Sequence, residues 1–139
     1  MEDAVSRYRT ASEEGDIGAL METLTADVEV VSPISGKMAF RGRDDVRILL
    51  SAVYGSLSDL RWTDTVGDGE RRVTLGEMRI GPVAMTDAMV FELAPDGLIR
   101  RIGPHLRPWL ALTLFAGVIG PKVARHPAVV RRALSSRPS

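Results

Sequence analysis

The sequence predicts an α+β domain in which helices cover one side of a curved antiparallel sheet, followed by a C-terminal helical extension. Three observations lead to this fold class. Up to residue 57, apolar residues recur at the three- and four-residue spacing of amphipathic helices. Over residues 60–106, polar and apolar residues alternate in runs that Gly, Pro and Asp separate. The order, helices first and a meander of strands afterwards, is typical of α+β domains.

Length and composition fit one soluble domain without a cofactor. The 139 residues are enough for a single core, and 45% hydrophobic with 26% charged residues is usual for a globular protein. The absence of cysteine excludes disulfides and thiol chemistry, and two histidines are too few for a histidine-rich metal site. We therefore expect neither a metal nor a cofactor. The acidic start of the chain is unlike a secretory signal, so we expect a cytoplasmic protein.

Two helices are predicted near the N-terminus. The first covers residues 3–14 and ends at Gly15, which favours the left-handed conformation of a C-terminal cap. Tyr8 lies on its apolar stripe, where a core tyrosine with a satisfied hydroxyl is the simplest interpretation. The second helix begins at Asp16 as N-cap, and its stripe consists of Ile17, Leu20, Met21 and Leu24.

Two short strands and a longer helix come next. Residues 27–33 and 38–41 have the alternation of strands, with a turn between them. Gly42 opens a helix whose first turn contains Asp44 and Asp45, where the helix dipole favours acids. The apolar stripe of this helix consists of Val46, Leu49, Leu50, Val53, Tyr54 and Leu57.

Four strands are predicted over residues 60–66, 71–80, 83–93 and 98–106. If Gly81 and Pro82 form a two-residue turn, Asp87 faces Gly76 and Met85 faces Met78. If residues 94–97 form the next turn, Asp87 faces Pro104 and Met89 faces Ile102. This register places His105 on the opposite face from Asp87.

The strand at 83–93 carries one carboxyl group on its bulkier apolar face, that of Asp87. A buried ionised carboxylate costs several kcal/mol unless it is paired, or it takes up a proton instead. Asp87 therefore either has a partner or lines a cavity where a neutral acid is useful. Gly76 and Pro104 beside it leave room for a ligand. The expected ligand-binding wall consists of Ser32, Trp62, Met85, Met89, Ile102, Pro104 and Leu106.

The C-terminal part is expected to be a helical extension, residues 108–139, on a pocket domain of residues 1–107. Its apolar run 109–119 is too short to span a bilayer, and Gly120-Pro121 is expected to break it. From Gly97 on there is no acidic residue, but there are eight basic ones: Arg100, Arg101, Arg107, Lys122, Arg125, Arg131, Arg132 and Arg137. We favour packing of this tail on the acidic body of its own molecule or a dimer mate. A lid over the pocket and peripheral contact with a membrane are the alternatives.

Short motifs in this chain resemble the nuclear transport factor 2-like cone fold. They are Arg7-Tyr8, Gly15-Asp16-Ile17, Asp27-Val28, Ser32-Pro33 and Phe40-Arg41-Gly42-Arg43. This superfamily includes ketosteroid isomerases, SnoaL-like polyketide cyclases and limonene epoxide hydrolases. The resemblance covers about residues 4–109 and implies a cone-shaped α+β barrel with a hydrophobic pocket, and a homodimer.

The match to ketosteroid isomerases is closer at two points and fails at a third. By resemblance, Tyr8 and a protonated Asp87 would be the two catalytic hydrogen-bond donors to a substrate oxyanion. The position of the general base, an aspartate in those enzymes, is occupied by Ser32, and a hydroxyl is too weak a base for that role. Asp64 is a conceivable substitute if its strand face points inward, and Ser32 activated by His105 is a less favoured nucleophile.

The sequence thus predicts a pocket for a hydrophobic small molecule with a carbonyl or hydroxyl oxygen. Isomerisation or cyclisation through an enolate is one interpretation, and a non-catalytic carrier or sensor is the other. An epoxide hydrolase would need an arginine between two acids, and Arg79 with Asp87 lacks the second acid. No phosphate-binding loop and no aromatic-basic platform is present, so nucleic acid is not an expected partner.

Overall fold

The computed structural model describes residues 3–135, so that Arg137 of the basic tail lies outside the described part of the chain. The helices are α1 (Ala4–Glu14), α2 (Ile17–Met21), α3 (Arg43–Tyr54), α4 (Trp109–Ala124) and α5 (Pro127–Ser135). The strands are β1 (Leu24–Val31), β2 (Ala39–Arg41), β3 (Leu57–Val66), β4 (Arg71–Ile80), β5 (Val83–Leu93), β6 (Ile99–Gly103) and β7 (Leu106–Arg107).

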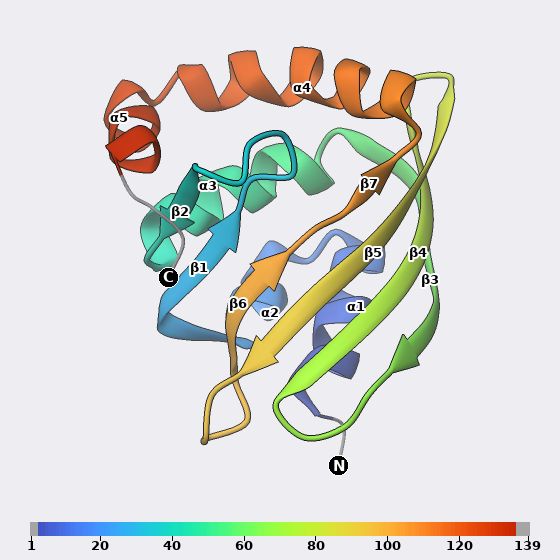
Figure 1. Cartoon of the computed structure of the whole chain (residues 1–139), viewed down its shortest axis with the longest axis vertical. Coiled ribbons are helices and arrows are strands. Elements are labelled where there is room, and N and C mark those ends of the chain that lie inside the picture. The colour runs from blue at the N-terminus through green and yellow to red at the C-terminus, as the bar shows by residue number, and fades with distance from the viewer. Residues whose placement is uncertain (1–2, 136–139) are drawn as a thin grey trace.

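The strands form one sheet in the order β2-β1-β6-β5-β4-β3, with β7 pairing with β5 beyond the end of β6. β1 and β6 run parallel, and the other neighbours are antiparallel. The long strands curve around α1, α2 and α3, and α4 crosses one end of the sheet (Figure 1). The core lies between the inner face of the sheet and the helices. This arrangement confirms the predicted fold class.

The N-terminal helices begin and end largely where the sequence predicts. The carboxylate of Asp3 accepts a hydrogen bond from the backbone N–H of Ser6, and Gly15 ends α1 with a φ of 71°. Asp16 caps α2 in the same way through the N–H of Ala19. The prediction was wrong for Leu24, which begins β1, because α2 ends at Met21 and the chain then enters the sheet.

The strand registers are partly as predicted. β4 and β5 pair as expected, with Asp87 opposite Gly76. The predicted pairing of β5 with the following strand was wrong by two residues: Asp87 faces Leu106 rather than Pro104, and Ile102 faces Phe91 rather than Met89. A bulge in the pairing next to Glu92 accounts for part of the shift. Because the shift is two residues at Phe91 and Asp87, the side chains of Ile102 and Leu106 keep their predicted face.

Helix α4 does not break at Gly120-Pro121 but continues to Ala124. A proline inside a helix leaves the carbonyl four residues earlier without its hydrogen bond. Here that residue is Gly117, which is exposed like Pro121 itself, so that water can satisfy the carbonyl. The expected break was wrong for this reason.

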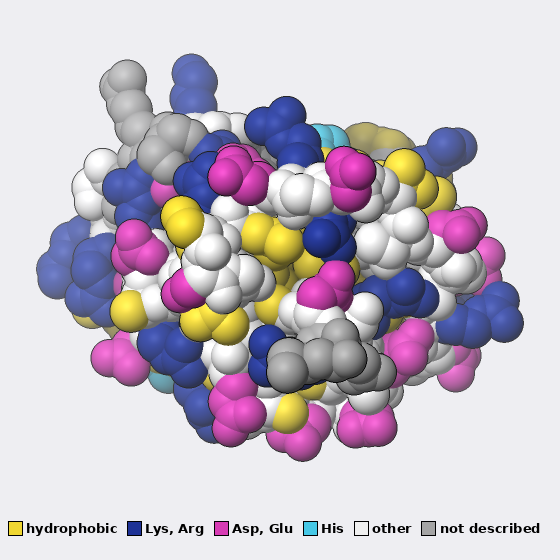
Figure 2. All heavy atoms as spheres, turned by 90° about the horizontal axis from the view of Figure 1, so that it is seen from below, with side chains coloured by type: hydrophobic (Ala, Val, Ile, Leu, Met, Phe, Trp, Pro, Cys, Tyr) yellow, Lys and Arg dark blue, Asp and Glu magenta, His cyan; other side chains and the backbone are white. Residues whose placement is uncertain are grey.

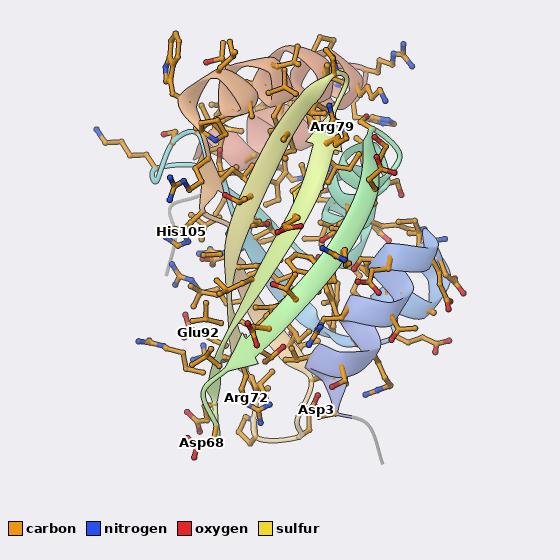
Figure 3. All side chains as sticks on the ribbon, turned by 90° about the vertical axis from the view of Figure 1, so that its right-hand side faces the viewer. Asp3, Asp68, Arg72, Arg79, Glu92 and His105 are labelled. Atoms are coloured by element: carbon orange, nitrogen blue, oxygen red, sulfur yellow. The ribbon has the colours of Figure 1, made fainter. Side chains whose placement is uncertain are left out.

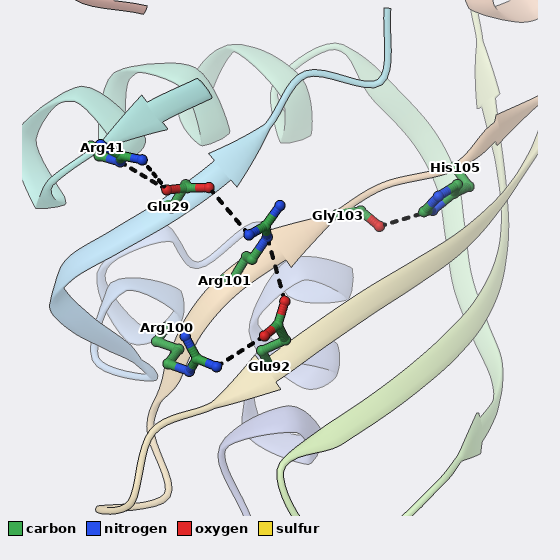
Figure 4. A network of polar contacts seen from close by, with 7 residues as sticks. All are labelled: Glu29, Arg41, Glu92, Arg100, Arg101, Gly103 and His105. Carbon is green, nitrogen blue, oxygen red and sulfur yellow. Dashed lines mark hydrogen bonds and ion pairs between the residues drawn. The ribbon is translucent and has the colours of Figure 1, made fainter. Parts of the chain in front are cut away.

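Part of the basic tail packs on acidic groups of its own chain, as favoured from the sequence. Arg132 on α5 forms two hydrogen bonds, of 2.8 and 2.9 Å, with the carboxylate of Asp45 on α3. Arg101 lies between Glu92 and the buried Glu29, and Arg100 pairs with Glu92 (Figure 4).

The surface carries both signs of charge. On the face shown in Figure 2, Lys and Arg side chains alternate with Asp and Glu around a recess where apolar side chains are visible. Within residues 3–135, no helix is both long enough and apolar enough to cross a membrane.

Candidate ligand cavity

A cavity of about 250 Å³ lies between the inner face of the sheet, α3 and α4. All the residues predicted to form the ligand-binding wall line it, and so does Asp87. They come from different elements: Ser32 follows β1, Trp62 is on β3, Met85 and Met89 are on β5, Ile102 is on β6, Pro104 follows β6 and Leu106 is on β7. Apart from the hydroxyl of Tyr54, the rest of the wall is apolar and comes from α3, α4 and the segment around β1 and β2, with smaller contributions from β3, β4 and α5.

Asp87 carries the one carboxyl group among the described residues that line the cavity. Its side chain is buried, at 6% exposure, and its Oδ1 accepts a 3.1 Å hydrogen bond from the backbone N–H of His105. No ion pair is found for it within the described chain. Burial raises the pKa of Asp87 to about 7, although the hydrogen bond from His105 acts in the opposite direction. A neutral, proton-bearing form is therefore accessible near neutral pH.

Tyr8 and Tyr54 form a pair beside this acid. Their hydroxyl oxygens lie 2.6 Å apart, and the rings meet edge to face. Burial raises the pKa of both phenols, and the nearby charge of Asp87 adds to the effect, so both hydroxyls remain protonated at physiological pH. Tyr54 lines the cavity, whereas the fully buried Tyr8 is not among the lining residues.

Ser32 also lines the cavity, and its hydroxyl is already engaged as an acceptor. Its Oγ accepts the backbone N–H groups of Ile34 at 3.2 Å and Ser35 at 3.3 Å, which fixes the turn after β1. Its remaining hydrogen-bonding capacity is mainly that of a donor. Ser32 is therefore suited to donate a hydrogen bond into the cavity rather than to act as a base.

The space that the sequence suggested beside Gly76 is filled. A Cβ atom at Gly76 would lie 2.4 Å from Cε3 of Trp62, so the indole packs directly on the glycine backbone. The room beside Asp87 therefore opens toward α3 and α4 rather than across β4. This prediction was wrong because one residue, Trp62 on β3, reaches over the neighbouring strand.

The other catalytic groups considered from the sequence, namely His105, Arg79 and Asp64, do not lie together at the cavity. Figure 3 shows the labelled His105 and Arg79 on the outer side of the sheet, and the exposed His105 ring contacts the carbonyl oxygens of Ala88 and Gly103 through Nδ1. Asp64 is exposed because a bulge after Trp62 reverses the side on which it points. Neither His105 nor Asp64 lines the cavity with Ser32. Within residues 3–135, no group of three metal-ligating side chains is found.

Sequence reasoning missed two contributions to the site. Tyr54 was placed only on the apolar stripe of its helix, although a tyrosine on a stripe that faces an acid-bearing strand could have been considered as a donor. For the C-terminal extension, a lid over the pocket was only the less favoured alternative. In the structure, Phe115, Ile119 and Val123 of α4 line the cavity. Their four-residue spacing gave one inward face, but the sequence did not indicate what that face covers.

The curved sheet, the helices on its inner face and the apolar cavity between them define a cone-shaped α+β class of domain. Within this class, residues 5–102 match the SnoaL-like domain, and the chain belongs to this family. No curated protein matches the sequence significantly.

Solved structures of similar fold are numerous. An uncharacterised bacterial protein of cystatin-like fold from Silicibacter pomeroyi has a TM-score of 0.87 at 21% identity, with 96% of this chain and 95% of that chain covered. A steroid delta-isomerase from Pseudomonas aeruginosa has a TM-score of 0.80 at 20% identity, with 90% and 92% covered. The epoxide hydrolase/cyclase-like enzyme of pyran ring formation in the polyether salinomycin has a TM-score of 0.65 at 18% identity, with 78% and 90% covered. At such identities the likeness establishes the fold alone.

Proposed function

We propose that this protein binds a hydrophobic small molecule through a carbonyl or hydroxyl oxygen, with Asp87 in its protonated form as a hydrogen-bond donor. The observation that carries the proposal is the buried Asp87 carboxyl, without an ion-pair partner in the described chain, on the wall of an apolar cavity. A protonated acid in such surroundings is a strong donor to a developing or permanent oxygen charge, because water does not compete for it.

Tyr54 and Tyr8 complete this donor set. The hydroxyl of Tyr8 is fully buried, and its hydrogen-bond partner in the described chain is Tyr54. If Tyr8 donates to Tyr54, every hydrogen is used and the hydrogen of Tyr54 is left for a ligand in the cavity. Tyr54 then contacts the ligand oxygen, and Tyr8 positions and polarises Tyr54.

As an enzyme, the protein would isomerise or cyclise its substrate through an enolate, with Asp87 and Tyr54 stabilising the oxyanion. The steroid delta-isomerase and the cyclase-like enzyme among the structural neighbours support this class of chemistry. The missing component is a base to remove the carbon-bound proton, because by the resemblance to the isomerases Ser32 takes the place of their base.

A non-catalytic carrier or sensor is the second candidate, and the composition of the cavity wall favours it. Besides Asp87, no carboxyl or imidazole side chain of the described residues lines the cavity, so this part of the wall holds no second group suited to proton abstraction. Ser32→Asp separates the two candidates: if the natural protein is a carrier, this change would create isomerase turnover on an enone that the natural protein binds without converting.

The decisive test of the donor role is the pH dependence of ketone binding in three proteins: the natural one, Asp87→Asn and Asp87→Leu. Between pH 5.5 and pH 8.5, the natural protein should lose affinity by about thirtyfold, because it must hold a proton whose pKa is about 7. Asp87→Asn keeps a donor that does not titrate and should bind equally at both pH values. Asp87→Leu should bind weakly at both. A natural protein whose affinity is the same at both pH values would overturn the proposed role of Asp87.

A further inference from the structure

One end of the cavity is closed by a rigid wall, the indole of Trp62. Its Nε1–H donates to Oγ of Ser12 at 2.8 Å, and its backbone N–H donates to Oε2 of Glu13 at the same distance. Its ring rests on Gly76 with no space for even a Cβ atom between them. Because both ends of the residue are hydrogen-bonded to α1, the indole cannot swing away to lengthen the cavity without breaking these bonds.

The opposite side is closed by α4 and the start of α5. Phe115, Ile119 and Val123 line the cavity from α4, and Val130 does so from α5. This layer is tied to the body of the domain by a hydrogen bond from Lys122 to Ser56 and by the two hydrogen bonds from Arg132 to Asp45. The size of the space between the two walls is therefore set by the fold.

That space limits how much of a ligand the cavity can enclose. A protein cavity of about 150 Å³ accommodates benzene, so the present 250 Å³ corresponds to about ten carbon atoms. It is also below the roughly 300 Å³ at which pockets for drug-sized molecules begin. The four fused rings of a steroid exceed what this space encloses, although the fold is similar to that of a steroid delta-isomerase.

The polar groups limit the chemistry of the ligand. The oxygen-bearing side chains in the wall are those of Ser32, Tyr54 and Asp87, and each can donate a hydrogen bond when Asp87 is protonated. Among residues 3–135, no lysine or arginine side chain lines the cavity, so a carboxylate or phosphate would be buried there without a counter-charge from this part of the chain.

We infer that the cavity takes a neutral molecule of about ten carbon atoms with one ketone or hydroxyl oxygen, such as a bicyclic or branched alicyclic ketone, and excludes steroids. This inference rests on the proposed function and narrows it to a class of ligand. The oxygen lies at the end formed by Asp87 and Tyr54, and the hydrocarbon part lies between Trp62 and α4.

The experiment compares three probes on the full chain: 2-decalone, decalin and androst-4-ene-3,17-dione. The chain has two tryptophans, and Trp109 is 78% exposed at the start of α4. In a Trp109→Phe background, Trp62 is the only tryptophan, so its fluorescence reports occupation of the cavity. We expect 2-decalone to bind at least tenfold more tightly than the steroid, and decalin to bind more weakly than 2-decalone.

Enlarging the cavity should shift the binding preference from 2-decalone toward the steroid. Trp62→Leu, followed by calorimetry, should raise the affinity for the steroid at least tenfold, and Trp109→Leu is the matched control that should change neither affinity. If Trp62→Leu does not fold, Ile119→Ala widens the wall formed by α4 and should shift the preference in the same direction.

The outcomes separate the inference from the function on which it rests. If the steroid binds the natural protein as tightly as 2-decalone, the size limit is wrong while the proposed function stands. If decalin binds as tightly as 2-decalone, the donor role in the proposed function is wrong while the size limit stands. If none of the three probes binds the folded protein, both are wrong.

Discussion

The hydroxyl oxygens of Tyr8 on α1 and Tyr54 on α3 lie 2.6 Å apart in the core, and Tyr54 alone of the two lines the cavity. Two phenols from separate helices therefore form a short hydrogen-bonded pair that ends at the cavity. In the proposed function the two residues have different tasks, contact with the ligand for Tyr54 and support for Tyr8. The two tasks can be separated by measurement.

We expect Tyr54→Phe to weaken binding of 2-decalone about fivefold, because one hydrogen bond to the ligand, worth about 1 kcal/mol, is lost. Tyr8→Phe should change the affinity less than twofold. It should nevertheless lower the free energy of unfolding by about 1 kcal/mol, because it removes a buried hydrogen bond. Titration calorimetry and urea denaturation measure the two effects. A larger loss of affinity in Tyr8→Phe than in Tyr54→Phe would show that Tyr8 is the group in contact with the ligand.

The raised pKa of Asp87 predicts how stability depends on pH. The pKa is about 7 in the folded protein and near its ordinary value of 3.8 when unfolded, so between these values the folded state holds a proton that the unfolded state has lost. Stability from this group is thus fully present below pH 4 and is lost as the pH rises through 7. The total is on the order of 4 kcal/mol, since each tenfold change in proton affinity is worth about 1.4 kcal/mol.

Asp87→Asn is the control for this pH dependence, because it removes the titration and keeps the shape of the side chain. As the pH rises from 4.5 to 8, the unfolding free energy of the natural protein should fall relative to that of the Asn variant. Urea denaturation of both proteins at each pH measures this difference. Parallel pH profiles would mean that the carboxyl is solvated in the folded protein.

Gly76→Ala should destabilise the protein by about 1–3 kcal/mol, because the new methyl group would overlap the indole of Trp62 and one of them must move. The matched control is Gly117→Ala on the exposed face of α4, where a Cβ meets nothing within 4 Å. That change should stabilise the protein by up to about 1 kcal/mol, because alanine favours the helix over glycine. Equal thermal shifts in the two variants would contradict the close packing of Trp62 on Gly76.

The contact between Arg132 and Asp45 should control how firmly α5 is held against α3. Arg132→Gln and Asp45→Asn should each lower the melting temperature and speed the release of a bound ketone, and the double variant should be little worse than either single one. Arg131→Gln, on the exposed neighbouring residue, is the control and should alter neither quantity. Strictly additive effects of the two changes would mean that the contact does not stabilise the closed arrangement.

Local patterns in the sequence were enough to predict most elements and the face on which Asp87 lies. Period-two alternation around Asp87 fixed which side chains share its side of the sheet, and this survived a two-residue error in register because side chains alternate with the same period. The caps at Asp3, Gly15 and Asp16 act within a few residues, so they too could be predicted from the sequence.

What only the tertiary structure decided is how distant segments share one cavity. The pairing of Tyr54 with Tyr8, the indole of Trp62 over Gly76, and α4 as a wall of the ligand space all join residues far apart in the sequence. Such contacts depend on the curvature of the sheet and on the helix positions, which local periodicity does not encode. The sequence by itself therefore determined that a buried acid faces an apolar interior, and the packing of the whole chain decided the size of that interior and the donors beside the acid.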